Sequence, residues 1–309
     1  MRVFASLLMA LSLPIEAADD VVLNQAWEDL VYLASTAREG RAPNTVGSED
    51  AQRYISERFA NAALQGLFEE GQYRHPFSYE SGLNRWSGTN LIGVRSGQSK
   101  QFIVITAHYD HIGRVFGVVH PGADDNASGV AAMLALAQQS QSRMFTHSLM
   151  FVATDAEEKG LIGSKALIEG PNFPLDSVSA NINLDMLAQL GRPARLYLSG
   201  TNTHQAFDGL VSLVNQSILQ DPAIRLIKEH RQPRGRRSAL TEINFKNASD
   251  HAVFADNGIP YLFFGVGVHP YYHSPDDSAD RIDAENFKQA VTVAWALLNE
   301  VDQRLSVEN

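Results

Sequence analysis

Apolar residues follow two different periods along this chain. Positions spaced three and four residues apart predict amphipathic helices after Asn24 and after Ser48, and a last helix after Asp283. Short runs rich in β-branched and aromatic residues predict strands at residues 90–94, 102–106, 148–154, 180–184, 195–198 and 260–264. Further helical stretches lie among these strands, at residues 127–139, 161–168 and 203–219. This alternation predicts an α/β fold with a largely parallel sheet and helices on both faces, in one domain.

The composition is that of a globular protein without disulfide bonds. The 309 residues are 44% hydrophobic and 19% charged and include no cysteine, so core packing rather than disulfide bonds must hold the fold. A net charge of −10 argues against a nucleic-acid-binding protein, because phosphate binding needs clustered Lys and Arg. No repeat or added dimerisation domain is visible, so we expect a monomer.

The first 17 residues have the composition of a secretory signal. Arg2 provides a positive start, Val3 to Leu13 form an apolar run, and Ala17 is a small residue suited to cleavage. The apolar run is too short to span a bilayer. The alternative to a secretory signal is a buried N-terminal helix. We therefore predict an exported protein, periplasmic or secreted, whose mature domain covers residues 18–309 and has no stable association with a membrane.

Five polar segments contain residue types that bind zinc. Their sequences are HYD, DDNASG, DAEEKG, NLDM and YHSPDD, and they begin at residues 108, 124, 155, 183 and 272. Zinc binds imidazole nitrogen and carboxylate oxygen, and a hydrolytic pair of zinc ions needs ligands on each metal, a bridging carboxylate and a free base. Several of these segments directly follow predicted strands, where open α/β sheets place their sites. We therefore expect the segments to meet.

Each segment also has an ordinary structural interpretation. A buried His108 beside an acid is commonly structural, and residues 124–129 could simply cap a helix. Glu157 and Glu158 could be a solvated pair at a helix start. Asp185 is harder to explain in this way, because a buried acid after an apolar run needs a metal or a hydrogen-bond network. The five segments taken together favour the metal site.

In the order of these motifs, the chain resembles the co-catalytic zinc aminopeptidases typified by the secreted bacterial leucyl aminopeptidases. Relatives of that family include glutamate carboxypeptidase II and the glutaminyl cyclases. The resemblance extends from Gly40 to the loop around His273 and implies a central mixed sheet of about eight strands. It also implies an exopeptidase with two zinc ions per chain that removes N-terminal residues from peptides.

The resemblance assigns the metal ligands to five positions: His108, Asp125, Glu158, Asp185 and His273. His108 and Asp185 would bind one zinc ion, Glu158 and His273 would bind the other, and Asp125 would bridge both. The choice of Asp125 over Asp124 rests on the family spacing before Ala-Ser-Gly. Because these places are then filled, we expect His111 and His120 to be neighbours of the site rather than ligands.

Two acids would act without binding metal. Glu157 would be the general base that takes a proton from a water shared by the zinc ions and returns it to the leaving amine. Consecutive residues at a strand end point to different sides, so Glu158 can face the metal while Glu157 faces the water. Asp110 would orient the imidazole of His108, a support that metal-bound histidines generally have.

Five residues are candidates for substrate contacts: Met186, Lys246, His251, Phe264 and Tyr272. The apolar ones could line a side-chain pocket or could equally belong to the core. Lys246 stands where the best-known secreted family members carry a transition-state tyrosine, so either Lys246, Tyr271 or Tyr272 would stabilise the oxyanion. His251 is expected in the pocket wall or behind the ligands.

Two other functions and one further feature stay open. A glutaminyl cyclase-like acyltransferase would work with a single zinc ion, and a non-catalytic binding ectodomain of the same fold would have lost metal ligands. The basic stretch from Arg225 to Lys246 is either a solvated surface loop or a flap over the site that attracts the carboxylates of peptides.

Overall fold

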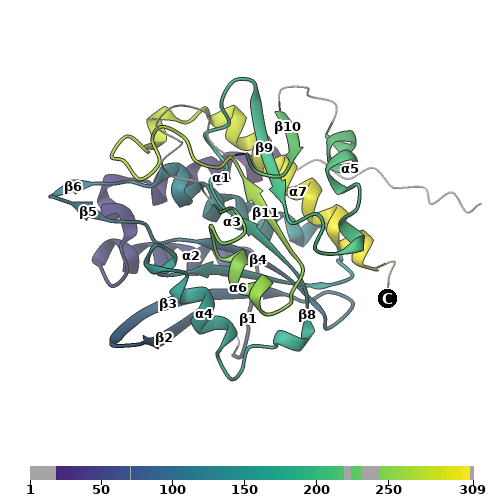
Figure 1. Ribbon diagram of the computed structural model, residues 1–309, viewed down its shortest axis with the longest axis horizontal. Helices are drawn as coiled ribbons and strands as arrows, with labels where there is room; N and C mark the ends of the chain where they lie inside the picture. Colours follow the sequence, from purple (N-terminus) through teal and green to yellow (C-terminus); the bar gives the residue numbers. More distant parts are fainter. Residues whose placement is uncertain (1–18, 70, 219–223, 232–243, 307–309) are drawn as a thin grey trace, which may run out of the picture.

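The centre of the protein is a nine-stranded mixed sheet (Figure 1). The computed structural model describes residues 19–69, 71–218, 224–231 and 244–306. The strands of this sheet are β1 Gln65–Gly66, β2 Arg74–Ser81, β3 Asn84–Arg95, β4 Phe102–His108, β7 Ser148–Thr154, β8 Val178–Leu184, β9 Ala194–Ser199, β10 Ile224–Lys228 and β11 Tyr261–Gly265. They follow the order β1-β3-β7-β4-β8-β11-β9-β10, and β2 pairs with β3. The central strands β7, β4, β8 and β11 are parallel, so their carboxyl ends lie at one edge.

Helices cover both faces of the sheet (Figure 1). One face carries α1 Asp20–Leu33, α2 Val46–Asn61, α3 Gly129–Gln139, α5 Leu210–Ser217 and α7 Ala284–Ser306. The other face carries α4 Ile162–Ile168 and α6 His251–Asp256. The first layer covers the larger core and the second the smaller one.

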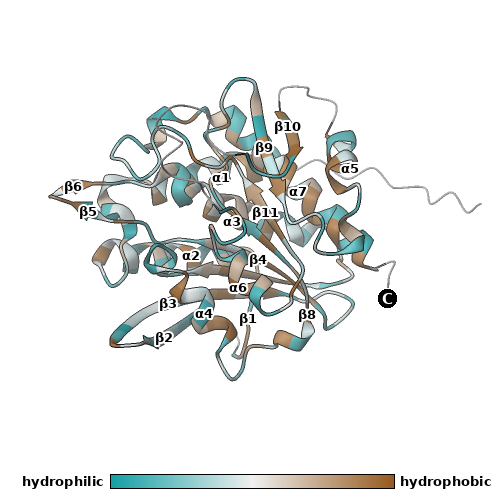
Figure 2. Ribbon diagram, in the orientation of Figure 1, coloured by the Kyte–Doolittle hydropathy of each residue, from teal (hydrophilic) through white to brown (hydrophobic). Residues whose placement is uncertain are grey.

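The alternation of side chains along β4 shows how both cores form. Ile103 and Ile105 belong to the larger core, whereas Val104 between them belongs to the smaller one. A parallel strand covered on both faces needs apolar residues on both sides, which explains the continuous apolar run of β4 and of β7 (Figure 2). These buried strands give the residues at their ends fixed positions.

The sequence predicts the central elements correctly and misses the peripheral ones. All six predicted strands are present, within one or two residues at most ends, and the α/β class with helices on both faces is confirmed. Strands β1, β2 and β10 were not predicted. The first helix begins at Asp20, because the side chain of Asp19 accepts the N–H of Val21 and caps it. The helix predicted at 203–219 is a short 3-10 turn, Gln205–Phe207, followed by α5.

Two predictions lie outside the described residues. The signal at residues 1–17 is one, and the middle of the basic stretch, residues 232–243, is the other. The beginning of that stretch is not a loop, because Arg225 and Lys228 lie in β10. Within the described ranges, no helix combines the length and apolar character needed to cross a membrane.

Candidate metal centre

The predicted segments meet at the carboxyl ends of the central parallel strands. His108 ends β4, Asp185 directly follows β8, and Asp125 lies in the turn η2 (Ala123–Ser128) before α3. His108 Nε2 lies 3.4 Å from Asp125 Oδ1 and 3.5 Å from Asp185 Oδ1. All three side chains are buried and present one compact group of donor atoms.

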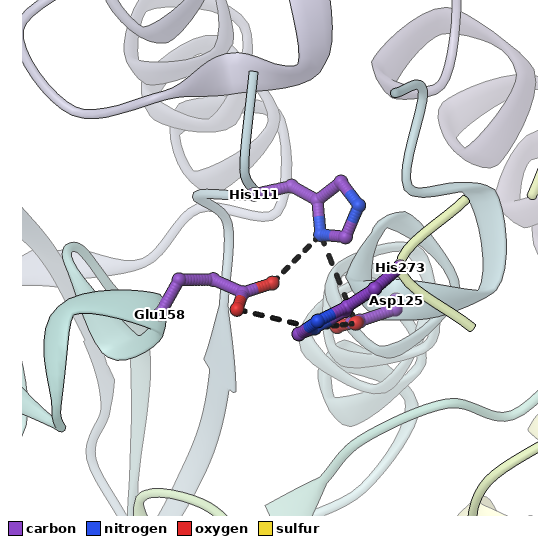
Figure 3. Close-up of side chains that lie close together, drawn as sticks. All are labelled: His111, Asp125, Glu158 and His273. Atoms are coloured by element: carbon purple, nitrogen blue, oxygen red, sulfur yellow. Dashed lines mark hydrogen bonds and ion pairs between the residues drawn. The ribbon is translucent and has the colours of Figure 1, made fainter. Parts of the chain in front are cut away.

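A second group of donor atoms, drawn in Figure 3, also includes Asp125. Glu158 lies in η4 (Glu157–Lys159) after β7, and His273 lies in the loop between β11 and α7. His273 Nε2 lies 3.1 Å from Asp125 Oδ2 and 3.2 Å from Glu158 Oε2. His111 faces the same atoms, with Nδ1 2.8 Å from Glu158 Oε1 and 3.7 Å from Asp125 Oδ2. The two groups therefore use opposite oxygens of Asp125.

Asp124 is engaged elsewhere, which leaves Asp125 to serve both groups. Asp124 Oδ1 accepts the N–H of Ala188 at 2.6 Å and the hydroxyl of Ser128 at 3.0 Å. Its other oxygen, Oδ2, lies 3.2 Å from Nε2 of His269. These contacts hold the loop after β8 against the start of α3.

Asp110 fixes the turn that carries Glu157 and Glu158. Its Oδ1 accepts the N–H of Glu157 at 3.0 Å, and its Oδ2 accepts the N–H of Glu158 at 3.4 Å. Asp110 also lies beside His108, and its nearest contact there is made by the backbone. The backbone carbonyl of Asp110 lies 3.1 Å from His108 Nδ1, whereas the nearest carboxylate oxygen is 3.8 Å away. In the tautomer with the proton on Nδ1, the Nδ1–H group donates to this carbonyl. The lone pair of Nε2 is then free and faces Asp125 and Asp185.

Glu157 belongs to neither donor group. Among the residues that the structure describes, its carboxylate makes no hydrogen bond or ion pair. Burial raises the pKa of Glu157 well above its usual value, the charge of His108 opposes the shift, and Asp250 adds to it. A carboxyl group with a raised pKa, held beside the ligands but not among them, suits proton transfer.

The histidines of the two groups respond to a surplus of buried negative charge. Burial alone would lower the pKa of His108, but Glu157 and Asp185 raise it well above the usual value. Burial also opposes the shift of His273, whose pKa Asp125 and Glu158 raise to about 10. A buried cluster of acids needs positive charge, which either protons or metal ions can supply.

The donor atoms fit zinc in both groups. Among the residues that the structure describes, Asp125 Oδ2 and Asp185 Oδ1 are buried without a hydrogen-bond partner of suitable geometry, a costly state that a cation relieves. Zinc binds nitrogen and oxygen at about 2.0–2.2 Å, so the ligands of a tetrahedral site lie roughly 3.3–3.5 Å apart. The separations measured here, from 2.8 to 3.7 Å, span that value.

Arg41 ties together the loops that carry the donor atoms, a role that no motif in the sequence indicates. Its guanidinium is fully buried and donates to the carbonyls of Leu33, Tyr109, Pro121 and Gly122 at 2.7–2.9 Å. Burial lowers the pKa of Arg41 to about 10, so it stays charged at neutral pH. The segment after β4 and the turn before Asp125 are thereby held by one side chain.

Left-handed backbone conformations occur in three of the site segments, two of them just after a strand end. Ala156 has φ 55°, Met186 has φ 57° and His273 has φ 53°. Non-glycine residues adopt such values at a cost, and the surrounding structure must hold them there. Asn126 holds Met186, because its Oδ1 accepts the N–H of Met186 at 3.1 Å. These left-handed conformations change the direction of the chain, so the spacing of the motifs does not reveal the geometry of the site.

Two candidate substrate residues lie next to the donor groups. Met186 directly follows Asp185 and is 6% exposed. The ring of Tyr272 stacks on His273 with 3.8 Å between ring centroids, and it is 37% exposed. Burial raises the pKa of the Tyr272 hydroxyl, and Asp125 and Glu158 raise it further, so the hydroxyl keeps its proton.

The other three candidates have different surroundings. Phe264 is fully buried within the larger core, so its side chain is a packing residue rather than part of an exposed pocket. Lys246 is exposed, and its backbone N–H donates to the side chain of Asn244. His251 is buried in α6 and stacks on Phe263 with 4.4 Å between ring centroids. None of the three belongs to a donor group within the described residues.

The sequence model of peptidase family M28 matches residues 90–298, a range that contains every donor residue. The chain belongs to peptidase family M28. A relative from Bacillus subtilis strain 168, named aminopeptidase YwaD, is 29% identical over 229 residues, which cover 68% of this chain and 44% of that protein. The chain spans about half the length of the curated relatives it matches.

Solved structures confirm the M28 fold. The zinc aminopeptidase BSAP from Bacillus subtilis superposes with a TM-score of 0.68 at 17% identity, over 90% of this chain and 95% of that one. A glutaminyl cyclase from Porphyromonas gingivalis also has a TM-score of 0.68 at 17% identity, over 90% and 98% of the two chains. The fold alone therefore does not distinguish peptide hydrolysis from cyclisation.

Proposed function

We propose that this M28 protein is a zinc-dependent aminopeptidase that binds two zinc ions per chain and removes N-terminal residues from peptides. The observation that carries the proposal is the position of Asp125, whose two oxygens face two separate groups of donor atoms. One zinc ion would be held by His108 and Asp185, and the other by Glu158 and His273, with Asp125 between them.

The residues around the centre have separate chemical tasks. Bound zinc ions would lower the pKa of a water and polarise the scissile carbonyl. Glu157 takes the proton of the attacking water and passes it to the leaving amine, and its raised pKa suits both steps. Asp110 keeps the turn of Glu157 in place through the backbone N–H. The protonated hydroxyl of Tyr272 is available to donate to the oxyanion, whereas Lys246 has no described contact with the centre.

Peptide hydrolysis is favoured over the two alternatives by the donor set. A single-zinc cyclase would need only one group of ligands, but both groups here have at least three members. A non-catalytic ectodomain would not need Glu157 in a buried position beside them. The aminopeptidases named among the relatives support an N-terminal rather than an internal cleavage site.

Hydrolysis of amino-acid p-nitroanilides tests the proposal directly. We expect release of p-nitroaniline from substrates with a free amino group, little release from their N-acetylated counterparts, and loss of activity after exhaustive chelation. Zinc should restore the activity. Cyclisation of glutaminyl peptides without anilide hydrolysis would support the cyclase alternative instead.

We also propose that the mature domain acts as a monomer outside the cytoplasm. The composition of the first 17 residues supports export. N-terminal sequencing of the exported protein and light scattering of the mature chain test the two parts.

A further inference from the structure

His111 is the residue of the centre that the motif assignment leaves unexplained. It lies three residues after His108, at the start of the loop that leads to the hairpin of β5 (Arg114–Val115) and β6 (Val118–Val119). Its side chain is completely buried. The ring packs against the turn before Asp125: a Cβ atom on Gly122 would lie 2.2 Å from the carbonyl oxygen of Asp125 and 2.5 Å from His111 Cδ2. The imidazole is thus held close to the turn that carries Asp125.

The ring of His111 is directed by the donor atoms and not by a hydrogen bond on its far side. Among the described residues, Nε2 of His111 is buried without a hydrogen-bond partner. Nδ1, in contrast, lies 2.8 Å from Glu158 Oε1 and 3.7 Å from Asp125 Oδ2 (Figure 3). An unpaired polar atom in the interior costs free energy, so the interaction at Nδ1 must outweigh that cost.

The separations around His111 match those expected of a metal ligand. The other nitrogen of this group, His273 Nε2, lies 3.1 and 3.2 Å from the same two carboxylates. One donor atom from each of the four side chains lies within 4.8 Å of every other. The rings of His111 and His273 meet edge to face at 68°, so both nitrogens can point to one centre without a clash.

We propose that His111 is a fourth protein ligand of the zinc ion held by Asp125, Glu158 and His273. This inference rests on the proposed two-zinc function. It makes the two metal positions unequal, because within the described part of the chain the other group consists of His108, Asp125 and Asp185. Zinc positions with four protein ligands are typically structural and tight, whereas positions with three keep a place for water or substrate. The His111 position fills first, and the His108 position is the exchangeable one.

X-ray absorption of protein loaded with one equivalent of zinc tests this assignment. The first zinc ion should show outer-shell scattering from two imidazoles, those of His111 and His273. A single imidazole at one equivalent overturns the proposal. That result is expected if the first zinc ion binds the His108 group, or binds the His273 group without His111. The measurement uses the wild-type chain and needs no variant.

Substitutions at His111 separate a metal ligand from a hydrogen-bond donor. Nδ1 of His and the terminal atoms of Asn and Asp are all bonded to Cγ, so all three side chains reach the same point. Asn can donate a hydrogen bond to Glu158 but is a poor zinc ligand, whereas Asp can bind zinc but cannot donate. We expect H111N to lose more than about 100-fold in affinity at one zinc site and H111D to lose less. Wild-type affinities in H111N would contradict the proposal.

His120 provides the matched control. It is a buried histidine in the same hairpin segment, its Nδ1 lies 3.2 Å from the carbonyl of Val118, and it belongs to neither donor group. H120N should keep both zinc affinities. A wild-type chain that binds no zinc would defeat the proposed function itself, whereas two bound zinc ions with one imidazole at the first would defeat only the role of His111.

Discussion

Glu157 and Glu158 are adjacent but have different surroundings, and substitution separates their tasks. Glu157→Gln should keep both zinc ions and lose roughly 10²- to 10⁴-fold in kcat, the usual contribution of a positioned base. Glu158→Gln should bind one zinc ion more weakly, because His273 and His111 both contact this carboxylate. Metal titration and kcat of the two variants are the measurements.

Excess zinc is the control for this pair. It should partly restore the activity of Glu158→Gln and have no effect on Glu157→Gln. Zinc rescue of Glu157→Gln, or a full metal content in Glu158→Gln without added zinc, would show that the two roles are reversed.

His251 should make the metal-free protein sensitive to acid. Burial lowers the pKa of His251 to about 4, below the usual 6.5, so its contribution to stability is present above pH 6.5 and is lost as the pH falls toward 4. His251→Gln can still donate to the carbonyl of Phe245, which the His251 ring approaches at 2.9 Å, but it does not titrate. Chemical denaturation at pH 7 and pH 5 should show a smaller loss for the variant. Equal losses would exclude His251 as the titrating group.

The residue types of the centre were predictable from the motifs, but several of their contacts were not. The sequence placed His108 and Asp185 at the ends of buried strands and Asp125 in a turn before a helix, and the structure brings them together. It did not reveal that the carbonyl of Asp110 approaches His108, because backbone contacts depend on local dihedral angles. The sequence predicts His111 to be a neighbour of the site, because the motifs already provide five ligands and their spacing does not give the positions of side chains.

At the level of elements, Arg41 holds the segments that carry the donor atoms. Arg41→Met would leave four buried carbonyls without their shared donor, so it should lower the free energy of unfolding by about 3 kcal/mol or more. It should also weaken zinc binding, because two of these carbonyls directly precede η2. Arg114→Met is the control, since Arg114 makes an exposed ion pair with Glu39 and should cost about 1 kcal/mol or less. Equal costs for the two variants would contradict the anchoring role.

Buried elements were predictable and exposed ones were not. Strand β7 is buried at every position and reads as an apolar run, so its bounds were predicted correctly. Strand β2 pairs with β3 from Arg74 to Ser81 at the edge of the sheet, where polar residues hide the signal. In β10 the buried Ile224 and Leu226 alternate with the exposed Arg225, a strand pattern too short to stand out in a basic stretch.

For the whole molecule, metal binding should contribute to stability as well as to activity. A zinc concentration 100-fold above the dissociation constant adds about 2.7 kcal/mol per site. Chelation should therefore lower Tm by several degrees, because the carboxylates of Asp125, Glu158 and Asp185 then lack cations. Differential scanning calorimetry with and without chelator measures the shift. An unchanged Tm would mean that these acids do not hold a metal in the folded protein.

In the proposed function, two groups of donor atoms around Asp125 hold two zinc ions. Metal analysis of the purified protein, combined with titration of the chelated protein with zinc, is the decisive measurement. We expect two zinc ions per chain, bound with different affinities, and activity that appears only when the second ion binds. One zinc ion per chain at saturation, or none, would contradict it.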